Sequence, residues 1–205
     1  MGSSIDAVVF DLDGVLVQSE ELWDAARRDL VAAAGRPWPP DATSAMMGMS
    51  SPEWSRYLHE SLGVPAEPAA ISARVVEAIE ERYRRDPPWI DGAREAVTRI
   101  AACWPLGLAT SSNREIIDLV LEVGGLASYF AVTVSSEEVE RGKPAPDVYL
   151  QAARMLEAAP QRCTAIEDST NGIRSAHAAG MRVIAIPNSA HAPSGEALGL
   201  SLIHI

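Results

Sequence analysis

Short apolar runs alternate with longer amphipathic stretches along most of the chain. The first apolar run covers residues 5–10 and ends in Asp-Leu-Asp-Gly, as a buried strand ends at a polar turn. Later runs of the same kind predict strands at residues 106–109, 131–134, 164–166 and 182–186. Amphipathic stretches predict helices at residues 92–102, 114–123, 146–156 and 171–179. This alternation predicts an α/β fold, a parallel sheet with helices on both faces that binds ligands at the carboxyl ends of its strands.

The pattern changes between the first predicted strand and the pair Pro87-Pro88. This segment is almost wholly helical in character, with amphipathic helices predicted at residues 20–34, 52–62 and 69–85. We therefore expect a helical cap domain, residues 17–87, inserted into a core domain made of residues 1–16 and 88–205. Gly14 and Pro87-Pro88 lie at the two junctions, where a hinge would have to absorb backbone rotation.

Composition and charge narrow the classes of partner. The 205 residues are 47% hydrophobic and 22% charged, the balance of an ordinary globular protein. The net charge of -11 argues against nucleic acid and anionic membranes, because both require a basic surface on the protein. The two cysteines match no metal-ligand spacing, and the chain has neither a signal sequence nor an apolar run of membrane-spanning length. We expect a soluble, cytoplasmic protein.

Two aspartates follow the first predicted strand. Asp11 and Asp13 are two residues apart in extended chain, so their carboxylates can enter one site, where they repel each other unless a cation is present. Mg²⁺ prefers such oxygen ligands. With it, Asp11 could attack the phosphorus of a phosphate ester, and Asp13 could act first as the acid and then as the base. The alternative is an aspartate-rich turn or helix cap without chemistry.

Polar residues at the end of the second predicted strand could bind an anion. Thr110 could contact a phosphoryl oxygen, and Ser111, Ser112 and Asn113 lie where backbone N–H groups become free at the start of a helix. Ser112 or Asn113 could instead simply cap that helix.

Two further motifs supply a cation and more carboxylates. Lys143 is fixed between Gly142 and Pro144 and could neutralise a phosphoryl group, although most loop lysines are inert. Glu167 and Asp168 close the fourth predicted strand. We expect Asp168 to bind the metal directly, and Glu167 to replace a water ligand or to orient the ligands from behind.

The four motifs, in this order and spacing, resemble those of the haloacid dehalogenase superfamily over residues 5–188. The resemblance implies a Rossmann-like core with a helical cap after the first strand. It implies Asp11 as the nucleophile, Asp13 as the acid and base, and phosphate contacts from Thr110 and Lys143. It also implies Mg²⁺ held by Asp11, by the backbone carbonyl of Asp13 and by Asp168.

Departures from the family pattern distinguish between its reactions. The second aspartate, Asp13, points to phosphoryl transfer and away from carbon–halogen hydrolysis. Ser51 stands where β-phosphoglucomutases carry an arginine, so we expect a magnesium-dependent phosphatase that acts through an aspartyl phosphate on a small phosphorylated metabolite, such as a sugar phosphate. The alternatives are a β-phosphoglucomutase and a catalytically silent binding protein with the same fold.

The cap is expected to select the substrate, because the core motifs contact only the phosphoryl group and the metal. The candidate residues are Glu20, Trp23, Met47, Gly48 and Arg56. Each has a structural alternative, since tryptophan and methionine usually fill cores and arginine usually faces solvent. A capped enzyme needs no partner to close its site, so a monomer is expected.

The carboxyl end departs from the family. The sequence after Gly199 stops where relatives continue through a last short strand into a closing helix. We expect at most an edge strand here, no helix beyond Leu200, and an exposed apolar patch.

Overall fold

The computed structural model describes residues 5–46, 49–187 and 192–204. Within these residues it contains a six-stranded parallel sheet with the strand order β3-β2-β1-β4-β5-β6. The strands are β1 (Ala7–Phe10), β2 (Leu106–Thr110), β3 (Phe130–Ser135), β4 (Cys163–Glu167), β5 (Arg182–Ala185) and β6 (Ile203–His204). The first five agree with the predicted strands to within two residues.

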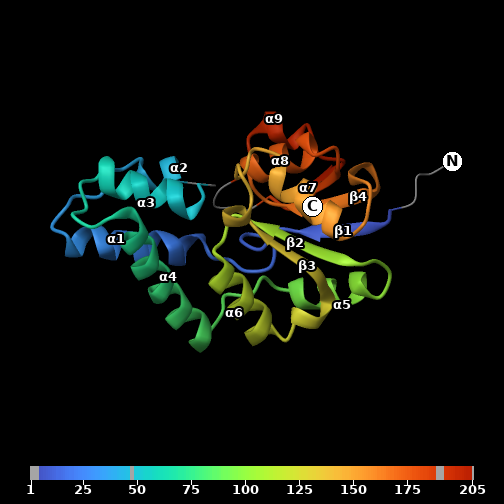
Figure 1. The fold of residues 1–205 in the computed structure, drawn as a ribbon, viewed down its shortest axis with the longest axis horizontal. Coiled ribbons are helices and arrows are strands. Elements are labelled where there is room, and N and C mark those ends of the chain that lie inside the picture. The colour runs from blue at the N-terminus through green and yellow to red at the C-terminus, as the bar shows by residue number, and fades with distance from the viewer. Residues whose placement is uncertain (1–4, 47–48, 188–191, 205) are drawn as a thin grey trace.

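Helices cover both faces of the sheet, so the predicted α/β architecture is confirmed. They are α5 (Ala93–Ala101), α6 (Arg114–Gly124), α7 (Asp147–Met155), α8 (Thr170–Ala178) and α9 (Gly195–Leu198). Alternate residues of β1 point to opposite faces. Val8 and Phe10 belong to the apolar cluster that includes α5 and α6, while Ala7 and Val9 belong to the cluster with α7, α8 and α9. Figure 1 shows these two groups of helices below and above the sheet.

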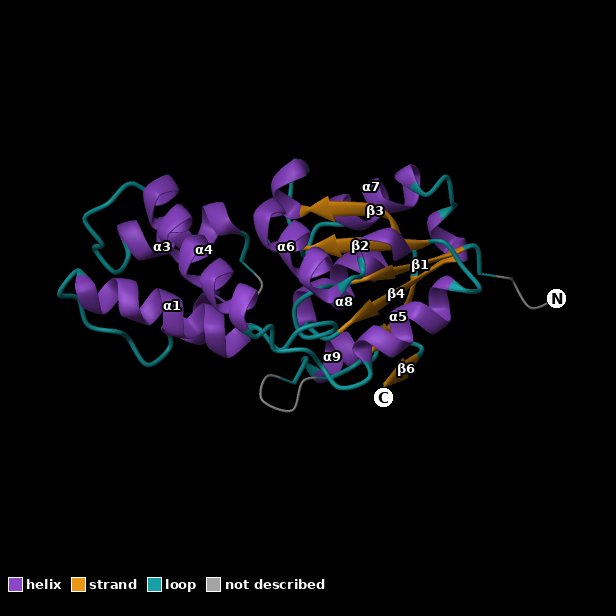
Figure 2. Ribbon diagram, turned by 90° about the horizontal axis from the view of Figure 1, so that it is seen from below, coloured by secondary structure: helices purple, strands orange, loops and turns teal. Residues whose placement is uncertain are grey.

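A second group of helices follows β1 in the chain, and we call it the four-helix unit. Its helices are α1 (Glu20–Ala33), α2 (Ala42–Met46), α3 (Ser51–Glu60) and α4 (Pro68–Arg85). Three of them were predicted, whereas α2 is too short to give an amphipathic pattern. In Figure 2 the strand arrows point toward this unit, so it lies beyond the carboxyl ends of the strands. The described residues between Gln18 and Asp86 include no strand.

Local sequence explains why the helices of this unit begin where they do and which side they bury. Helix α3 starts at a capping box, in which the backbone N–H of Ser50 donates to Glu53 Oε2 at 2.7 Å. Helix α1 buries Trp23 and Leu30, which are seven residues apart and lie on one helix face. These faces pack against α4, which contacts both α1 and α3.

Two chain segments run side by side where the four-helix unit joins the rest of the molecule. The backbone N–H of Gln18 donates to the carbonyl of Pro88 at 2.7 Å, and that of Ile90 donates to the carbonyl of Leu16 at 3.0 Å. Val17 and Trp89 form an antiparallel bridge between them. Gly14 and Pro87-Pro88, which were predicted to lie at the junctions, are therefore in or next to these paired segments.

The carboxyl-terminal segment adds the last strand. β6 pairs in parallel with β5 through Ile184 and Ile203, and it forms the edge of the sheet, as predicted. Leu202 and Ile203 are 66% and 54% exposed. The described residues after Leu200 contain no helix.

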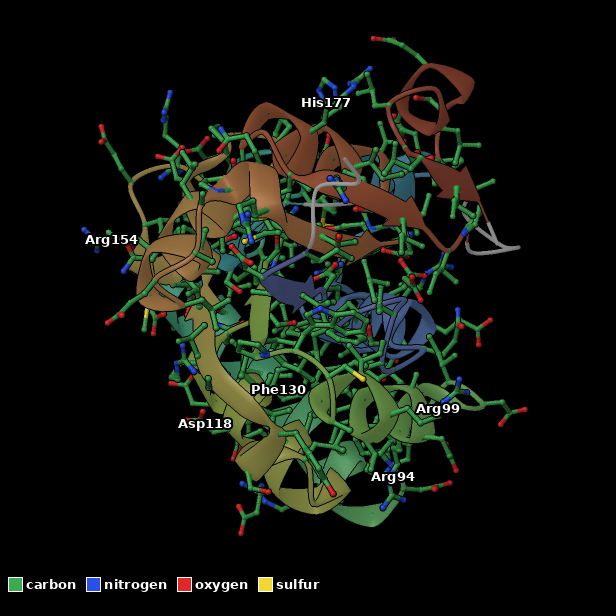
Figure 3. All side chains as sticks on the ribbon, turned by 90° about the vertical axis from the view of Figure 1, so that its right-hand side faces the viewer. Arg94, Arg99, Asp118, Phe130, Arg154 and His177 are labelled. Carbon is green, nitrogen blue, oxygen red and sulfur yellow. The ribbon has the colours of Figure 1, made fainter. Side chains whose placement is uncertain are left out.

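Charged side chains lie at the periphery of the face of the molecule opposite the four-helix unit. In Figure 3, which views this side, Arg99, Asp118 and Arg154 lie at the periphery, and Phe130 lies inside. Phe130 is 8% exposed and packs edge to face on Phe10. Across the described part of the chain, no helix combines the length and apolar character that a membrane span requires.

Candidate active site

A cavity of about 530 Å³ lies between the carboxyl ends of the strands and the four-helix unit. Eight of the predicted site residues line it: Asp11, Asp13, Glu20, Thr110, Ser111, Ser112, Lys143 and Asp168. Trp23, a candidate for substrate selection, lines it too. The motifs meet here because β1, β2 and β4 are neighbours in the sheet and end on the same side.

Three other predicted residues do not line this cavity. Glu167 is fully buried, and Asn113 and Arg56 line a separate groove between α3, α4 and the start of α6. Met47 and Gly48 lie outside the described residues.

A buried lysine joins two of the predicted carboxylates. Lys143 Nζ lies 3.0 Å from Asp11 Oδ1 and 2.6 Å from Glu167 Oε1, and the lysine is 6% exposed. Burial by itself would lower the pKa of Lys143, but the carboxylates of Asp11 and Glu167 outweigh it and raise that pKa above its ordinary value. Lys143 therefore stays charged, and its ammonium faces the nucleophile expected from the sequence.

Glu167 is held on both of its carboxylate oxygens. Oε1 accepts a hydrogen bond from the Tyr149 hydroxyl at 2.9 Å as well as from Lys143. Oε2 accepts from the backbone N–H groups of Asp168 at 3.0 Å and Ser169 at 3.1 Å. Burial alone would raise the pKa of Glu167, yet the Lys143 ammonium and these donors lower it. Glu167 is thus a fixed carboxylate behind the cavity wall.

Three acidic side chains offer ligand atoms close enough for one cation. Oxygens of Asp11, Glu167 and Asp168 all lie within 4.8 Å of one another. Burial, followed by the repulsion of Glu167 and Asp13, raises the pKa of Asp11 to about 8, although Lys143 opposes this. Burial and the same kind of repulsion raise the pKa of Asp168 well above its usual range. One ammonium does not balance these carboxylates, and oxygen donors in this number suit Mg²⁺.

Two glycines allow these carboxylates to approach the backbone. A Cβ at Gly14, whose φ is +75°, would lie 1.9 Å from Asp168 Oδ2. A Cβ at Gly172 would lie 1.7 Å from Glu167 Oε1. Any side chain at either position would displace an acid of the cluster.

Asp13 lies apart from this acidic cluster. The hydroxyl of Ser19 donates to Asp13 Oδ1, and the hydroxyl of Ser112 donates to Asp13 Oδ2. The cluster found among the described residues does not include the Asp13 carboxylate, and the resemblance assigned only its backbone carbonyl to the metal. The side chain is therefore oriented by the hydroxyl of Ser19, which precedes α1, and by that of Ser112 from the second motif.

The second motif divides between the cavity and a contact with the four-helix unit. Thr110 is the last residue of β2, and its Oγ1 accepts from the backbone N–H of Ser112 at 3.1 Å. Asn113 occupies the N-cap position of α6. Its Oδ1 accepts from the Ser51 hydroxyl at 2.6 Å, and its Nδ2 donates to Glu137 Oε1 at 2.8 Å. Asn113 thus connects α3 to the core and does not face the cavity.

Sequence analysis missed Ser19 and Tyr149. Ser19 precedes α1 and resembles an ordinary helix cap, and Tyr149 lies inside a predicted amphipathic helix, where an aromatic residue suggests core packing. Only the folded chain brings their hydroxyls to Asp13 and Glu167.

The chain is similar to known proteins over most of its length. Residues 5–180 match the family model of the haloacid dehalogenase-like hydrolases. The chain is 34% identical to hexitol phosphatase B of Escherichia coli (strain K12) over 193 residues, covering 88% of this chain and 83% of that protein. It is 32% identical to the phosphorylated carbohydrates phosphatase of Thermotoga maritima over 186 residues, covering 88% and 84%. The crystal structure of CbbY from Rhodobacter sphaeroides in complex with phosphate superposes with a TM-score of 0.86 at 26% identity, covering 98% of this chain and 93% of that one.

Proposed function

The chain belongs to the haloacid dehalogenase-like hydrolases, and from that premise we propose that it is a magnesium-dependent phosphatase of a small phosphorylated metabolite. One observation carries the proposal. The buried ammonium of Lys143 lies 3.0 Å from Asp11, and Asp11 shares an acidic cluster with Glu167 and Asp168 at one end of a cavity. Two relatives at 34% and 32% identity are named as phosphatases of a hexitol and of phosphorylated carbohydrates, which supports a sugar phosphate or a similar ester as the substrate.

The first chemical step forms a covalent bond to Asp11. Its carboxylate attacks phosphorus, the bond from phosphorus to the ester oxygen breaks, and Asp13 gives its proton to the departing alcohol. Lys143 and the Thr110 hydroxyl bind the non-bridging oxygens, which carry negative charge throughout. The hydroxyls of Ser19 and Ser112 keep Asp13 beside the cavity for this transfer.

The second step returns the enzyme to its starting state. Asp13 takes a proton from a water molecule, whose oxygen attacks phosphorus and breaks the bond to Asp11. Inorganic phosphate is released, and both aspartates regain their initial protonation states. One carboxyl group thus serves as the acid and then as the base.

The metal would be held by Asp11 and Asp168, with Glu167 orienting the ligands from behind. When bound, Mg²⁺ supplies positive charge that allows an anionic nucleophile to approach an anionic phosphoryl group. Two features support this assignment: the raised pKa values of Asp11 and Asp168, and the two glycines that leave room for Glu167 and Asp168.

We propose that the four-helix unit acts as a cap domain, residues 17–87, over a core made of the remaining chain. The pairing of Leu16–Gln18 with residues 88–90 supports a boundary there, because the two chain segments that enter and leave the four-helix unit lie side by side at that point. Glu20 and Trp23 are the predicted cap residues that line the cavity.

The mutase alternative is less well supported. Ser51 lies where the mutases are expected to carry an arginine, and its hydroxyl is bonded to Asn113 at 2.6 Å. This position therefore offers no cation for a second phosphate.

The test is phosphate release from a panel of phosphorylated sugars, polyols and sugar acids, with Mg²⁺ and with excess chelator. We expect turnover that needs Mg²⁺ and that falls by at least about 10³-fold in Asp11→Asn, because the nucleophile is lost. Asp91→Asn removes an exposed carboxylate outside the cavity and is the matched control, so it should retain activity. Turnover that persists in Asp11→Asn would refute the proposal.

A further inference from the structure

One face of α1 forms a wall of the cavity. Glu20, Trp23, Asp24 and Arg27 follow the helical pattern i, i+3, i+4, i+7, so they lie on one side of the helix. All four line the cavity, as does Trp54 of α3. This wall belongs to the four-helix unit and lies outside the motifs that hold the phosphoryl group.

Arg27 is held by two tryptophans. The carbon at the centre of its guanidinium lies 5.3 Å from the ring centroid of Trp23 and 4.8 Å from that of Trp54. Contacts of this kind attract the cation to the ring faces. They position the group without supplying an acceptor for its N–H donors.

The Nε–H group of Arg27 lacks an acceptor among the described residues. Nε is buried and has no hydrogen-bond partner. The neighbouring carboxylate of Asp24 is already committed, because Oδ2 accepts from Arg28 Nε at 2.6 Å and Oδ1 accepts from the Thr43 hydroxyl at 2.6 Å. Lys143, the other cation that lines the cavity, has two carboxylate partners, so within the described lining Arg27 is the cation without one.

Leaving this cation without an acceptor is costly. Burial lowers the pKa of Arg27 to about 10, although Asp24 and Asp13 oppose the shift. The group therefore remains protonated at neutral pH. An anion bound to this guanidinium would supply both a charge partner and an acceptor for the buried Nε–H.

We propose that Arg27 binds a second anionic group of the substrate, a carboxylate or a further phosphate, while the phosphoryl group to be removed lies against Asp11 and Lys143. The inference rests on the proposed phosphatase function and narrows its substrate class to phosphorylated sugar acids or sugar bisphosphates. A planar guanidinium suits either anion because it can donate two parallel hydrogen bonds. The cavity volume of about 530 Å³ is within the range of small-molecule sites.

The test compares substrates that differ only at the end remote from the scissile phosphate. In the first pair, sorbitol 6-phosphate has a CH₂OH group where 6-phosphogluconate has a carboxylate. In the second pair, fructose 1,6-bisphosphate carries a second phosphate that fructose 6-phosphate lacks. We expect the protein to prefer the anionic member of at least one pair by about tenfold or more in kcat/KM. The pair that shows the preference identifies the anion.

Substitutions of Arg27 assign that preference to its side chain. Arg27→Gln should reduce the ratio of the two kcat/KM values to about one. Arg27→Lys should give an intermediate ratio, because lysine keeps the positive charge but cannot donate two parallel hydrogen bonds. Arg74→Gln removes an exposed arginine of α4 that does not line the cavity, so it is the matched control and should keep the full ratio.

Three results would overturn the proposal. The first is a ratio of the two kcat/KM values near one in the unchanged protein, and the second is a ratio that is unchanged in Arg27→Gln. The third is an equal loss of kcat/KM on both members of a pair in Arg27→Gln, which would mean that Arg27 only packs between Trp23 and Trp54. Calorimetric binding of the same pairs to Asp11→Asn, with and without Arg27→Gln, separates this inference from the proposed function. If no substrate is hydrolysed, the phosphatase proposal fails, while the binding ratio still decides the role of Arg27.

Discussion

Gly14 and Gly172 show how a residue without a side chain can determine the chemistry of a site. A Cβ at Gly14 would overlap a carboxylate oxygen of Asp168, and a Cβ at Gly172 would overlap a carboxylate oxygen of Glu167. Gly14 also has a left-handed backbone conformation. The first of these glycines follows the aspartate pair and therefore brings the loop after β1 against the loop after β4.

Substitution of Gly14 separates backbone strain from loss of the metal site. Gly14→Ala should lose about 1–2 kcal/mol of folding free energy from its positive φ, and it should also lose Mg²⁺ binding and most activity, because the new methyl group displaces Asp168. Gly35 has φ +68° and open space around its missing Cβ, so Gly35→Ala should show the stability loss alone. Thermal unfolding and Mg²⁺ titration by calorimetry measure the two effects. Equal Mg²⁺ affinity in the two variants would contradict this account of Gly14.

Residue types and spacing predicted most of the motif side chains that the structure places at the cavity. Asp11, Asp13 and Lys143 could be identified because a strand, a rigid loop and paired acids leave local signals. The partners of these residues could not be identified, because Lys143 and Glu167 are 24 positions apart and meet only through the order of the strands. Asn113 could not be separated from its neighbours, since which side chain of a strand-to-helix turn faces the cavity depends on the neighbouring α3.

At the scale of elements, the contact between α3 and the start of α6 links the four-helix unit to the core. Ser51 is 2% exposed, and its hydroxyl donates to Asn113, which is bonded in turn to Glu137. Helix α4 also contacts α6, so the four-helix unit packs against α6 of the core. These contacts lie at the side of the cavity and hold its two walls together.

Removal of the Ser51 hydroxyl should loosen this link. Ser51→Ala leaves the buried Asn113 Oδ1 without a donor, which costs about 1–3 kcal/mol, and we expect KM to rise several-fold with a smaller change in kcat. Amide hydrogen exchange should become faster in the first turns of α3 and α6. Ser61→Ala, at the exposed carboxyl end of α3, is the control. Unchanged exchange at both helix starts would show that the contact does not hold the two parts together.

The elements themselves were largely predictable. The central strands β1, β2 and β4 are buried on both faces and appear in the sequence as continuous apolar runs, whereas the core helices show an amphipathic period. Helix α2 was missed because five residues are too few to show a helical period. An edge strand was the most that was expected at the carboxyl end, whereas the parallel register of β6 with β5 required the structure.

At the scale of the whole molecule, the net charge of -11 repels an anionic substrate, so the binding cavity itself must contain positively charged groups. Lys143 and Arg27 line the cavity, and the acidic cluster is suited to add Mg²⁺. The sheet makes this possible by ending β1, β2 and β4 on one side, under the four-helix unit (Figure 2). Substrate binding is therefore expected to depend on local charge and not on the overall field of the protein.

The central claim is that Asp11 becomes phosphorylated during turnover, and trapping this intermediate tests it most directly. In Asp13→Asn the base of the second step is absent, while p-nitrophenyl phosphate has a leaving group that departs without a proton. With Mg²⁺, this variant should therefore release about one equivalent of p-nitrophenol in a burst. Peptide mass spectrometry after acid quenching should then find one phosphoryl group on Asp11. Steady release of p-nitrophenol with no phosphoryl group on the protein, or with the group on another residue, would contradict the account.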